Sequence, residues 1–368
     1  MNVVSLVSYP FLPARSGGQK GIALFYKYFS KYHTVTIVTT EKNQPQFASG
    51  YACLNILSNS KFRYINPFIF FTIRKLIREK KATHLILEHP YYGWLGILLK
   101  KLCGIRLIVH SHNIEGLRWR SLKKWWWRIL WKYEETTHRF ADYNFFIQDE
   151  DREYAIKAFG LDGKKCMTVS FGTEIPNSPT AENRESSSRI LRQQLGIGDN
   201  QSLLLFNGSF QYTPNLEALQ NLLYRINPLL EKKNLSYVIL IIGIDIPDEI
   251  KNASFPNIKI LGFAENLELF LTGCNLFLNP VQSGGGIKTK LVEALAFNLN
   301  AVSTQNGAIG IDPDLCNGKL LIAPDNGWDL FAAEVSSAME IKKTMPPDFY
   351  DHFYWANITK RAAAFIEH

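Results

Sequence analysis

The sequence predicts an α/β protein of two domains, each built on a parallel β-sheet that helices cover on both faces. Short apolar runs typical of strands alternate with helical segments along the chain. The length of 368 residues suits two domains of ordinary size, each large enough for its own core. A segment rich in Ser, Pro and charged residues, 176–189, separates the halves and reads as an interdomain linker.

The first half, residues 1–175, is expected to form the amino-terminal domain. A helix is expected from Lys20 to about Tyr32, after the loop YPFLPARSGGQ. Six apolar runs are expected to be strands of one parallel sheet: VVSLVS (3–8), TVTIVTT (34–40), HLILE (84–88), RLIVH (106–110), YNFFI (143–147) and CMTVS (166–170).

Composition excludes several classes of protein. With 46% hydrophobic and 20% charged residues the chain is globular rather than disordered. Its five cysteines are scattered without a CxxC pair, which favours a reducing compartment and argues against structural zinc. The start, MNVVSLVSYPF, lacks the basic residues of a signal peptide, and no apolar run approaches about 18–20 residues. We therefore expect a soluble or peripheral protein.

The net charge of +8 is unevenly distributed. Residues 1–175 hold 26 Lys and Arg against 13 Asp and Glu, a net charge of +13, whereas residues 176–368 hold 15 against 20, a net charge of −5. A basic half suggests an anionic partner, which would be a membrane surface, a nucleic acid or a phosphorylated substrate. A merely solvated surface is the alternative.

The second half is expected to form another α/β domain over 190–348. Its predicted strands are SLLLF (202–206), YVILIIG (237–243), IKILGF (258–263), CNLFLNP (274–280), AVST (301–304) and KLLIAP (319–324). The last residues, 349–368, are expected to form an amphipathic helix whose apolar side carries Phe349, Phe353, Trp355 and Phe365.

One stretch, NPVQSGGGIKTKLVEALAFNLNAVST (279–304), reads as strand, glycine loop, helix and strand. Such a loop lies at the carboxyl end of a strand, where open α/β sheets bind ligands. The free amides of Ile287, Lys288 and Thr289 would face this edge with the positive end of the helix dipole, which favours an anion. Lys288 and Lys290 add positive charge, and Glu293 would accept hydrogen bonds from a ribose.

The segment GGGIKTKLVEALAFN resembles the donor-site signature of retaining glycosyltransferases of family 4, which have the GT-B fold. The resemblance implies two Rossmann-like domains facing a cleft, with a carboxy-terminal helix that crosses back to the amino-terminal domain. It also implies sugar transfer, with retention of configuration, from a nucleotide-sugar donor to an acceptor hydroxyl. The expected setting is bacterial surface polysaccharide or glycolipid synthesis, in the cytoplasm or at the inner face of the plasma membrane.

Other segments resemble the family less specifically. His112-Asn113 follows the strand RLIVH, where family members carry a histidine beside the donor sugar. Gly17 and Gly18 match the glycines of the family's first loop. Two departures stand out: Gly285 replaces the first glutamate of the family's Glu-x7-Glu pattern, and Ser209 replaces the arginine of its Gly-Arg pair. Lys288 and Lys290 would replace that missing charge.

The resemblance thus implies a set of site residues. The catalytic residues are expected to be His112 and Glu293. The acceptor-side residues are Gly17, Glu115 and Arg118. The donor-binding residues are Gly18, Asn113, Gly208, Ser209, Gly285, Gly286, Ile287, Lys288, Thr289, Lys290, Leu291 and Glu293. No cofactor and no metal are expected, because DED (149–151) starts a helix and DPD (312–314) reads as a turn.

The segment 118–133 holds five of the eight tryptophans, interleaved with six basic residues. On one helix, Trp119, Leu122, Trp126, Leu130 and Tyr133 would form a stripe. The rings would then belong to the domain core, or they would rest with their cationic neighbours on an anionic membrane near a lipid-linked or glycan acceptor. Single-stranded nucleic acid is a weaker alternative, because no nucleic-acid-binding module accompanies the segment.

Two other functions remain open. A GT-B epimerase would use the same fold on a nucleotide sugar, without an acceptor. A catalytically inactive partner subunit would explain the absent glutamate and the absent Gly-Arg pair.

Overall fold

The computed structural model describes residues 1–14 and 16–367. The chain forms two compact units, one of Met1–Phe171 with the carboxy-terminal segment from Trp355, and one of Gly172–Tyr354. Arg15, in the predicted loop 9–18, and His368, at the end of the predicted last helix, lie outside the described residues. The two units are called the amino-terminal and carboxy-terminal domains below.

The amino-terminal domain contains a seven-stranded parallel sheet with the order β3-β2-β1-β4-β5-β6-β7. Its strands are mostly continuous apolar runs, as a sheet covered on both faces requires. Their bounds are β1 Asn2–Val7, β2 Thr34–Thr40, β3 Ala52–Leu57, β4 His84–Glu88, β5 Arg106–Ser111, β6 Tyr143–Phe146 and β7 Cys166–Thr168. Six of them match predicted strands, and β3 was not predicted.

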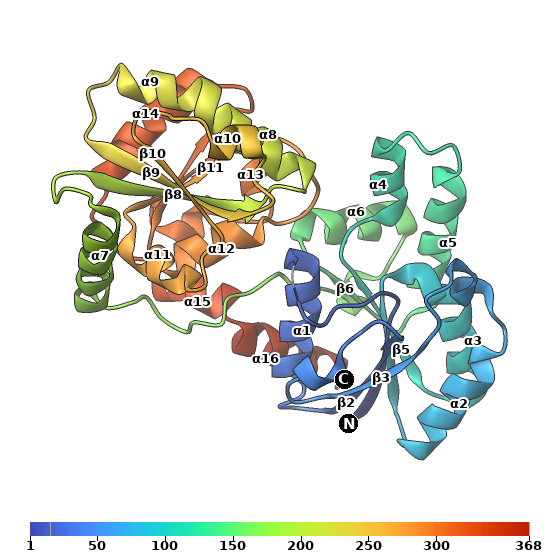
Figure 1. Cartoon of the computed structure of the whole chain (residues 1–368). Coiled ribbons are helices and arrows are strands. Elements are labelled where there is room, and N and C mark those ends of the chain that lie inside the picture. Colours follow the sequence, from blue (N-terminus) through green and yellow to red (C-terminus); the bar gives the residue numbers. More distant parts are fainter. Residues whose placement is uncertain (15, 368) are drawn as a thin grey trace. The chain divides into compact units, whose positions relative to one another are not determined.

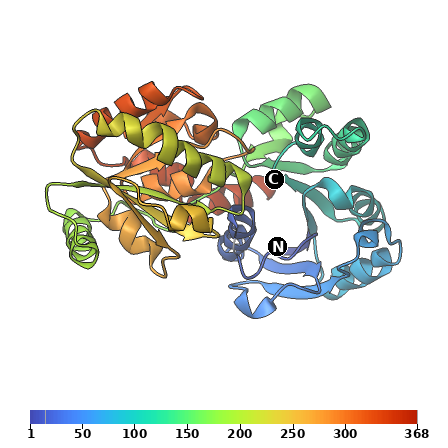
Figure 2. The same ribbon diagram turned by 45° about the horizontal axis from the view of Figure 1, so that its top comes forward.

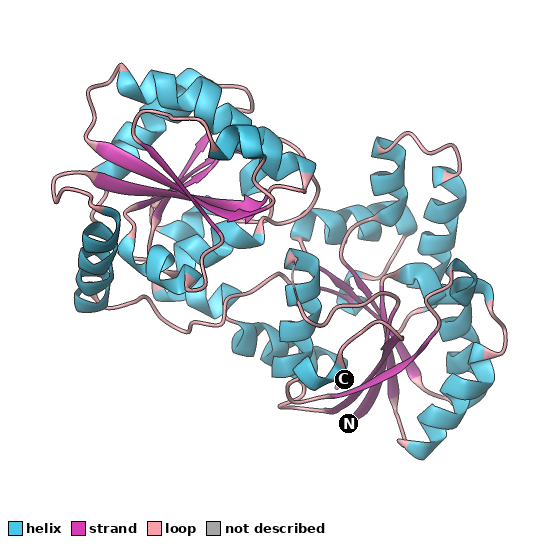
Figure 3. Cartoon of the chain, in the orientation of Figure 1, coloured by secondary structure: helices cyan, strands magenta, loops and turns pink. Residues whose placement is uncertain are grey.

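Helices cover both faces of this sheet (Figures 1 and 3). Helices α1 and α16 pack together on one face, and α2 and α3 lie on the other, with α5 against α3; the turned view shows the same layers (Figure 2). The helices are α1 Gly17–Phe29, α2 Ile69–Glu79, α3 Gly93–Cys103, α4 Glu115–Ser121, α5 Trp127–Phe140, α6 Asp149–Phe159 and α16 Trp355–Ile366, with short 3₁₀ turns η1 Pro45–Phe47, η2 Lys61–Ile65, η3 Pro90–Tyr92 and η4 Gly163–Lys165.

The carboxy-terminal domain contains a six-stranded parallel sheet with the order β10-β9-β8-β11-β12-β13. All six strands match predicted ones. Their bounds are β8 Ser202–Ser209, β9 Tyr237–Ile244, β10 Ile258–Gly262, β11 Leu276–Asn279, β12 Asn300–Thr304 and β13 Leu320–Ala323.

Two hydrophobic clusters fill the space between this sheet and its helices. One cluster lies under α7, α11, α12 and α15, and the other under α8, α9, α10 and α14 (Figure 1). The helices are α7 Ala181–Leu195, α8 Thr213–Asn221, η5 Leu222–Ile226 (a π-helical turn), α9 Asn227–Glu231, α10 Asp248–Lys251, α11 Leu267–Gly273, α12 Thr289–Ala296, α13 Gln305–Ala308, η6 Pro313–Cys316, α14 Trp328–Met339 and α15 Pro347–Phe353.

Each sheet has a point where the strand order reverses. In the amino-terminal domain this point lies between β1 and β4, and in the carboxy-terminal domain it lies between β8 and β11. The carboxyl ends of strands at such a point form the usual ligand site of an open α/β sheet. The structure therefore places the glycine loop after β11 at a switch point, together with the loop after β8.

The predicted linker 176–189 is wrong beyond its first five residues, because helix α7 begins at Ala181. Thr180 caps this helix by accepting a hydrogen bond from the Asn183 amide, and Arg184 donates to the carbonyls of Phe297 (2.6 Å) and Cys274 (2.8 Å). These contacts dock a polar segment onto the carboxy-terminal domain. The domain change therefore falls at Phe171–Gly172 rather than after residue 175.

The predicted helix over 349–368 is two helices. Tyr354 has an extended backbone (φ −73°, ψ 125°) that ends α15, and its own amide still bonds to the Tyr350 carbonyl. Helix α15 stays with the carboxy-terminal domain, and α16 joins the amino-terminal domain by packing on α1. A returning terminal helix is confirmed, and it starts at Trp355 rather than at 349.

The single tryptophan-bearing helix is also a wrong prediction. Helix α4 ends at Ser121 and α5 begins at Trp127, and between them Lys123 has a positive φ of 54°. None of the five tryptophans is fully buried, and Trp125 is 85% exposed. The interpretation of these rings as core alone is therefore wrong.

Candidate functional site

The loop after β11 depends on glycines for its path. Gly284 and Gly286 have φ values of 88° and 73°, which side-chain-bearing residues rarely adopt. A Cβ atom on Gly284 would also lie 2.7 Å from the hydroxyl of Tyr212, in the loop after β8. The glycines therefore let this loop approach the neighbouring one, and Gly285 between them is exposed.

Two lysines, one at the end of this loop and one at the start of the following helix, make hydrogen bonds to the loop and to the end of β8. Lys288 Nζ donates to the carbonyls of Gly284 (3.0 Å) and Gly286 (2.8 Å). Lys290 Nζ donates to the carbonyl of Asn207 (3.2 Å) and to Asn215 Oδ1 (2.9 Å). The second contact joins α8, which follows the loop after β8, to α12, which follows the glycine loop. Lys290 thus brings an amino group to the end of β8, close to Ser209 in the sequence.

Both ammonium groups have only neutral oxygen partners. Burial, and to a lesser extent the nearby charge of Lys288, lower the pKa of Lys290 to about 7. Burial lowers the pKa of Lys288 to about 8, against a small opposing effect of Asp325. A buried cation without a counter-ion is costly. These two lysines would gain from an anionic ligand.

The β8 loop is shaped by close backbone approach. A Cβ on Gly208 would lie 2.9 Å from Asn215 Nδ2, which instead donates to the Ser209 carbonyl (2.9 Å). Asn207 Oδ1, at the end of β8, and Gln282 Nε2, in the loop after β11, are buried without a hydrogen-bond partner among the described residues. Unpaired buried polar atoms are uncommon and suit a polar ligand.

Helix α12 begins at Thr289, with Lys288 as its N-cap. The amides of its first turn, including Thr289 and Lys290, point out of the helix without intrahelical partners. The Leu291 amide is bonded to the Lys288 carbonyl (2.9 Å), and the role of Leu291 in donor binding stays a prediction. Glu293 is half-buried, on the side of α12 that does not face the core. The side chain of Ile287 packs against the hydrophobic core, and the role of its amide stays a prediction.

A buried network holds the ends of β11 and β12 together. Asn279 Nδ2 donates to Ser303 Oγ (2.9 Å) and to the Gly307 carbonyl (3.0 Å), and Thr304 Oγ1 bonds to the Val281 carbonyl. A Cβ on Gly307 would lie 2.5 Å from Ser303 Oγ. This network fixes the strand ends from which the glycine loop starts.

In the amino-terminal domain, the predicted residue His112 belongs to a buried cluster at the ends of β4 and β5. Glu88, 1% exposed, contacts His112 Nε2 (2.6 Å) through Oε2, and His110 Nδ1 (3.0 Å) and the Tyr26 hydroxyl (2.6 Å) through Oε1. Glu88 and His110 are neighbours in the sheet register. Burial alone would raise the pKa of Glu88, but the two histidines outweigh it and hold the pKa well below its usual range.

His89 follows Glu88 in an unusual backbone conformation, with φ 66° and ψ 159°. Its amide bonds to the His110 carbonyl (2.9 Å), and its ring lies 4.5 Å from that of His112 between centroids. Such strain persists only where the surroundings fix it, and it is common at functional sites.

Glu115 lies beside this cluster and is fully buried. It accepts from the Tyr91 hydroxyl (2.8 Å) and from Arg118 (3.2 Å), and His89 Nδ1 is 3.6 Å away. Burial would raise the pKa of Glu115, but His89, Arg118 and Tyr91 hold it at about 2. Its amide, with that of Gly116, donates to the carboxylate of Glu134, and burial raises the pKa of Glu134 to about 8.

Glu88, His110 and His112 are also residue types that bind metals, and their ligand atoms lie within 4.8 Å of one another. Two ligand atoms that each lie about 2.0–2.2 Å from a metal ion would be roughly 3.3 Å from each other in a tetrahedral site. The 2.6 Å contact between Glu88 and His112 is shorter than this and is a hydrogen bond. The absence of a metal stays a prediction.

Gly17 and Gly18 form the first turn of α1, which the capping box of Ser16 and Gln19 starts. A Cβ on Gly18 would meet no atom within 4 Å, so space is open beside it. Asn113 is half-buried next to His112. The ligand roles of these three residues stay predictions.

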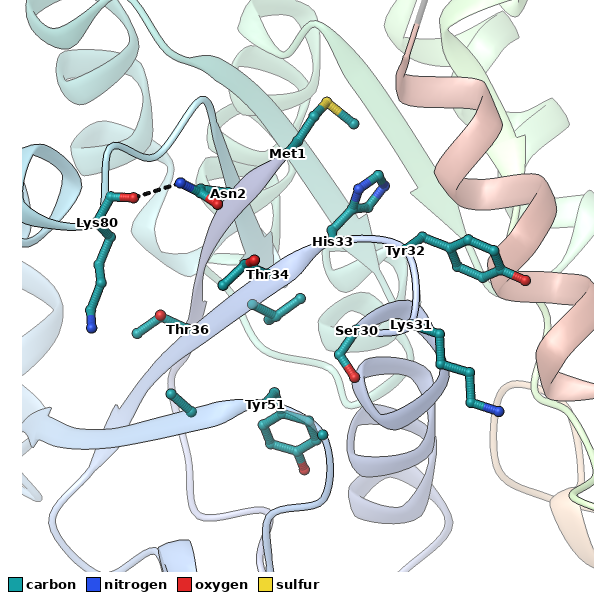
Figure 4. Close-up of a pocket in the computed structure, with 13 residues that line it drawn as sticks. Met1, Asn2, Ser30, Lys31, Tyr32, His33, Thr34, Thr36, Tyr51 and Lys80 are labelled. Atoms are coloured by element: carbon teal, nitrogen blue, oxygen red, sulfur yellow. Dashed lines mark hydrogen bonds between the residues drawn. The ribbon is translucent and has the colours of Figure 1, made fainter.

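A cavity of about 820 Å³ lies at the opposite, amino-terminal edge of the same sheet (Figure 4). Asn2, Thr34 and Thr36 line it from the strands, and Lys31 and Lys80 from flanking segments. None of the predicted site residues lines it. The cavity is therefore separate from the candidate site.

Sequence reasoning missed Glu88, His89, Tyr26 and Asn279. A usable signal was present for the first two, since polar residues at the carboxyl ends of two adjacent predicted strands, HLILE and RLIVH, meet at one edge of a parallel sheet.

Comparison with family models gives a match in each half of the chain. Residues 16–175 match the model described as Glycosyltransferase Family 4, and residues 201–340 match the model described as Glycosyl transferases group 1. Each match covers less than half of the chain, and they do not overlap.

The chain is also similar in sequence to a curated relative and in fold to solved structures. The chain is 24% identical over 272 residues to the chitobiosyldiphosphodolichol beta-mannosyltransferase of Debaryomyces hansenii, covering 66% of this chain and 57% of that protein. It is similar in structure to HepE of Anabaena in complex with UDP (TM-score 0.74, 13% identity, all of both chains) and to a glycosyltransferase of Rickettsia africae (TM-score 0.70, 15% identity, 100% of this chain and 98% of that one). These structures share the GT-B fold with this chain.

Proposed function

We propose that this chain, whose halves match two glycosyltransferase domain models on a GT-B fold, is a retaining glycosyltransferase that uses a nucleotide-sugar donor. The observation that carries the proposal is the meeting of Lys288, Lys290 and the first turn of α12 with the β8 loop. Two buried cations and free amides suit a diphosphate.

The proposed chemistry depends on positioning and charge. The amides of Thr289 and Lys290, with both ammonium groups, hold the diphosphate and stabilise the negative charge that grows as the sugar leaves. Glu293 accepts hydrogen bonds from the ribose. His112 lies beside the sugar, and the leaving phosphate helps to deprotonate the acceptor hydroxyl on the same face. No residue is required as a covalent nucleophile, and no metal is required.

The donor panel follows from the similar proteins. HepE of Anabaena was solved with UDP-glucose, and the curated relatives are named mannosyltransferases. The chain should therefore be incubated with UDP-glucose, GDP-mannose and other nucleotide sugars, with and without glycan and lipid-linked acceptors. Product formation that needs an acceptor supports transfer. Sugar turnover without an acceptor indicates an epimerase, and no turnover at all indicates an inactive partner. Proton NMR of the product then tests retention.

Nucleotide binding is expected to take up protons. The pKa values of Lys288 and Lys290 lie near 8 and 7 in the unliganded fold, below their usual 10.5. A bound diphosphate favours the charged forms, so affinity falls as the pH rises from about 6 to about 9. Without a ligand, these lysines bind more protons in the unfolded chain than in the folded one, because folding lowers their pKa values. The free energy of unfolding that they contribute therefore rises with pH between about pH 7 and 10.5. Calorimetry in buffers of different ionisation enthalpy measures the uptake, and pH-independent affinity would contradict it.

We also propose that the amino-terminal domain contacts an anionic membrane. Exposed apolar residues gather on two segments: Phe62, Ile65, Phe68 and Phe71 around η2 and α2, and Leu122, Trp125 and Ile129 around the α4–α5 turn. Basic residues accompany them, including Lys61, Lys75, Lys123, Lys124 and Arg128. Both segments follow strand carboxyl ends, β3 and β5, on the edge that carries His112. Among the described residues, no helix is long and apolar enough to cross a bilayer.

The double substitution Phe68→Ser/Trp125→Ser is expected to lower binding to phosphatidylglycerol vesicles about tenfold, because two large exposed rings no longer enter the interface. Co-sedimentation measures the bound fraction, and high salt should weaken wild-type binding. Phe263→Ser, which removes a 71% exposed ring from the carboxy-terminal domain, is the control. Equal binding of all three proteins would contradict the membrane proposal.

A further inference from the structure

The carboxylate of Glu88 is held by donors from helix α1, from strand β5 and from the loop that follows β5. The Tyr26 hydroxyl of α1 and His110 Nδ1 of β5 both reach Oε1, at 2.6 and 3.0 Å. His112 Nε2, just after β5, reaches Oε2 at 2.6 Å. Tyr26 is held in turn by Ser5 Oγ of β1 (2.6 Å). Two contacts on Oε1 fix the plane of the carboxylate and aim Oε2 at one ring nitrogen.

An ionised carboxylate only accepts hydrogen bonds, so each of its partners must donate. The pKa of Glu88 is held well below its usual range because the two histidines outweigh the effect of burial, so the group is ionised. His112 Nε2 must therefore carry a hydrogen. Whenever the His112 ring is neutral, this hydrogen is its one N–H, and Nδ1 is then a bare acceptor. His110 Nε2 is buried without a hydrogen-bond partner in the part of the chain that the structure describes. His112 Nδ1 is not among the buried, unpaired side-chain atoms of the described residues.

We propose that Glu88 is a positioning residue that holds His112 as its Nε2–H tautomer, so that Nδ1 is presented as an acceptor to a hydroxyl of the ligand. The sugar as that ligand rests on the proposed function, but the tautomer does not. Orientation of a working histidine by a second buried group is a general device, and loss of such a partner typically costs 10- to 100-fold in function.

The substitution Glu88→Gln makes the inference testable, because an amide cannot accept at both ends. Oε1 serves two donors, so the amide oxygen is expected to take that position and the NH₂ group to face His112. His112 Nε2 must then accept, and the ring changes to its Nδ1–H tautomer. A merely structural role of Glu88 would not predict this reversal.

Long-range ¹H–¹⁵N correlation spectra of the full chain labelled with ¹⁵N-histidine report the tautomer of each ring. The His112 signal is assigned by its loss in His112→Gln. Wild type is expected to show Nε2–H and Glu88→Gln to show Nδ1–H. Glu115→Gln is the matched control, since this equally buried carboxylate contacts His89 and not His112, and it should leave the His112 signal unchanged.

An Nδ1–H tautomer in wild type would overturn the proposal, and so would an unchanged tautomer in folded Glu88→Gln. If Glu88→Gln does not fold, the tautomer seen in the wild-type spectrum is the test of the proposal. Uptake of added Zn²⁺ at His112 Nε2 would also overturn it. With an active donor and acceptor pair, Glu88→Gln should lower kcat about 10- to 100-fold and leave nucleoside diphosphate affinity unchanged. If no transfer is found, the proposed function fails while the tautomer result still stands.

Discussion

Replacing Lys290 by methionine is expected to lower kcat/KM for the nucleotide-sugar donor about 100- to 1,000-fold, the usual effect of removing one preorganised charge donor. Lys290 is the cation that joins the glycine loop region to the end of β8 and the start of α8, through Asn207 and Asn215. Methionine keeps an unbranched side chain of similar volume and removes the ammonium group, whose nitrogen lies 4.5 Å from the centroid of the Phe206 ring. Initial rates at varied donor concentration measure the effect.

The fold should tolerate this change. A buried ammonium without a counter-ion is replaced by an apolar group of similar volume, so the free energy of unfolding should not fall. Lys233→Met, at an exposed position after α9, is the matched control and should keep wild-type kinetics. A folded Lys290→Met protein with wild-type kcat/KM would contradict the donor site described here.

Replacing His112 by alanine is expected to lower kcat about 100-fold, because the proposed hydrogen bond to the reacting sugar would be lost. It should also lower the free energy of unfolding by about 1–3 kcal/mol, because Glu88 Oε2, buried and ionised, loses its hydrogen-bond donor. Turnover at saturating donor and urea unfolding measure the two effects.

His352→Ala, on α15 of the carboxy-terminal domain, controls for the loss of a histidine and should keep wild-type turnover. A His112→Ala protein that is less stable but fully active would limit His112 to a structural role. One that is inactive and equally stable would contradict its hydrogen bond to Glu88.

The sheets could be predicted because buried parallel strands are continuous apolar runs, as β4 (HLILE) and β9 (YVILIIGI) show. Strand β3 (ACLNIL) lies at a sheet edge and is mostly half-buried, so its sequence carries a weaker signal. Helix α7 was missed because its first residues are polar. Only Leu191 of the helix is fully buried, and its docking depends on the Arg184 bonds to distant carbonyls.

One part of the candidate site could likewise be predicted from the sequence, and another part could not. The glycine loop and its lysines are contiguous in sequence, so their proximity could be predicted, and the contact of Lys290 with Asn215 is consistent with the expected replacement of charge. The partners of His112 could not be predicted by spacing, because Glu88, Tyr26 and His110 come from three elements that only the strand order brings together. Asn279 reads as a strand end in the sequence, and its bonds to Ser303 and Gly307 depend on the pairing of β11 with β12.

The most direct test of the central claim, a nucleotide-sugar donor site at the loop after β11, is thermal unfolding with UDP, GDP, ADP and CMP. At 100 times its Kd, a nucleotide that binds only the folded protein adds about 2.7 kcal/mol, or roughly 5–10 °C for a domain of this size. We predict that one diphosphate raises the melting temperature of wild type and not that of Lys288→Met/Lys290→Met. No response of the wild type to any of the four nucleotides would contradict the account.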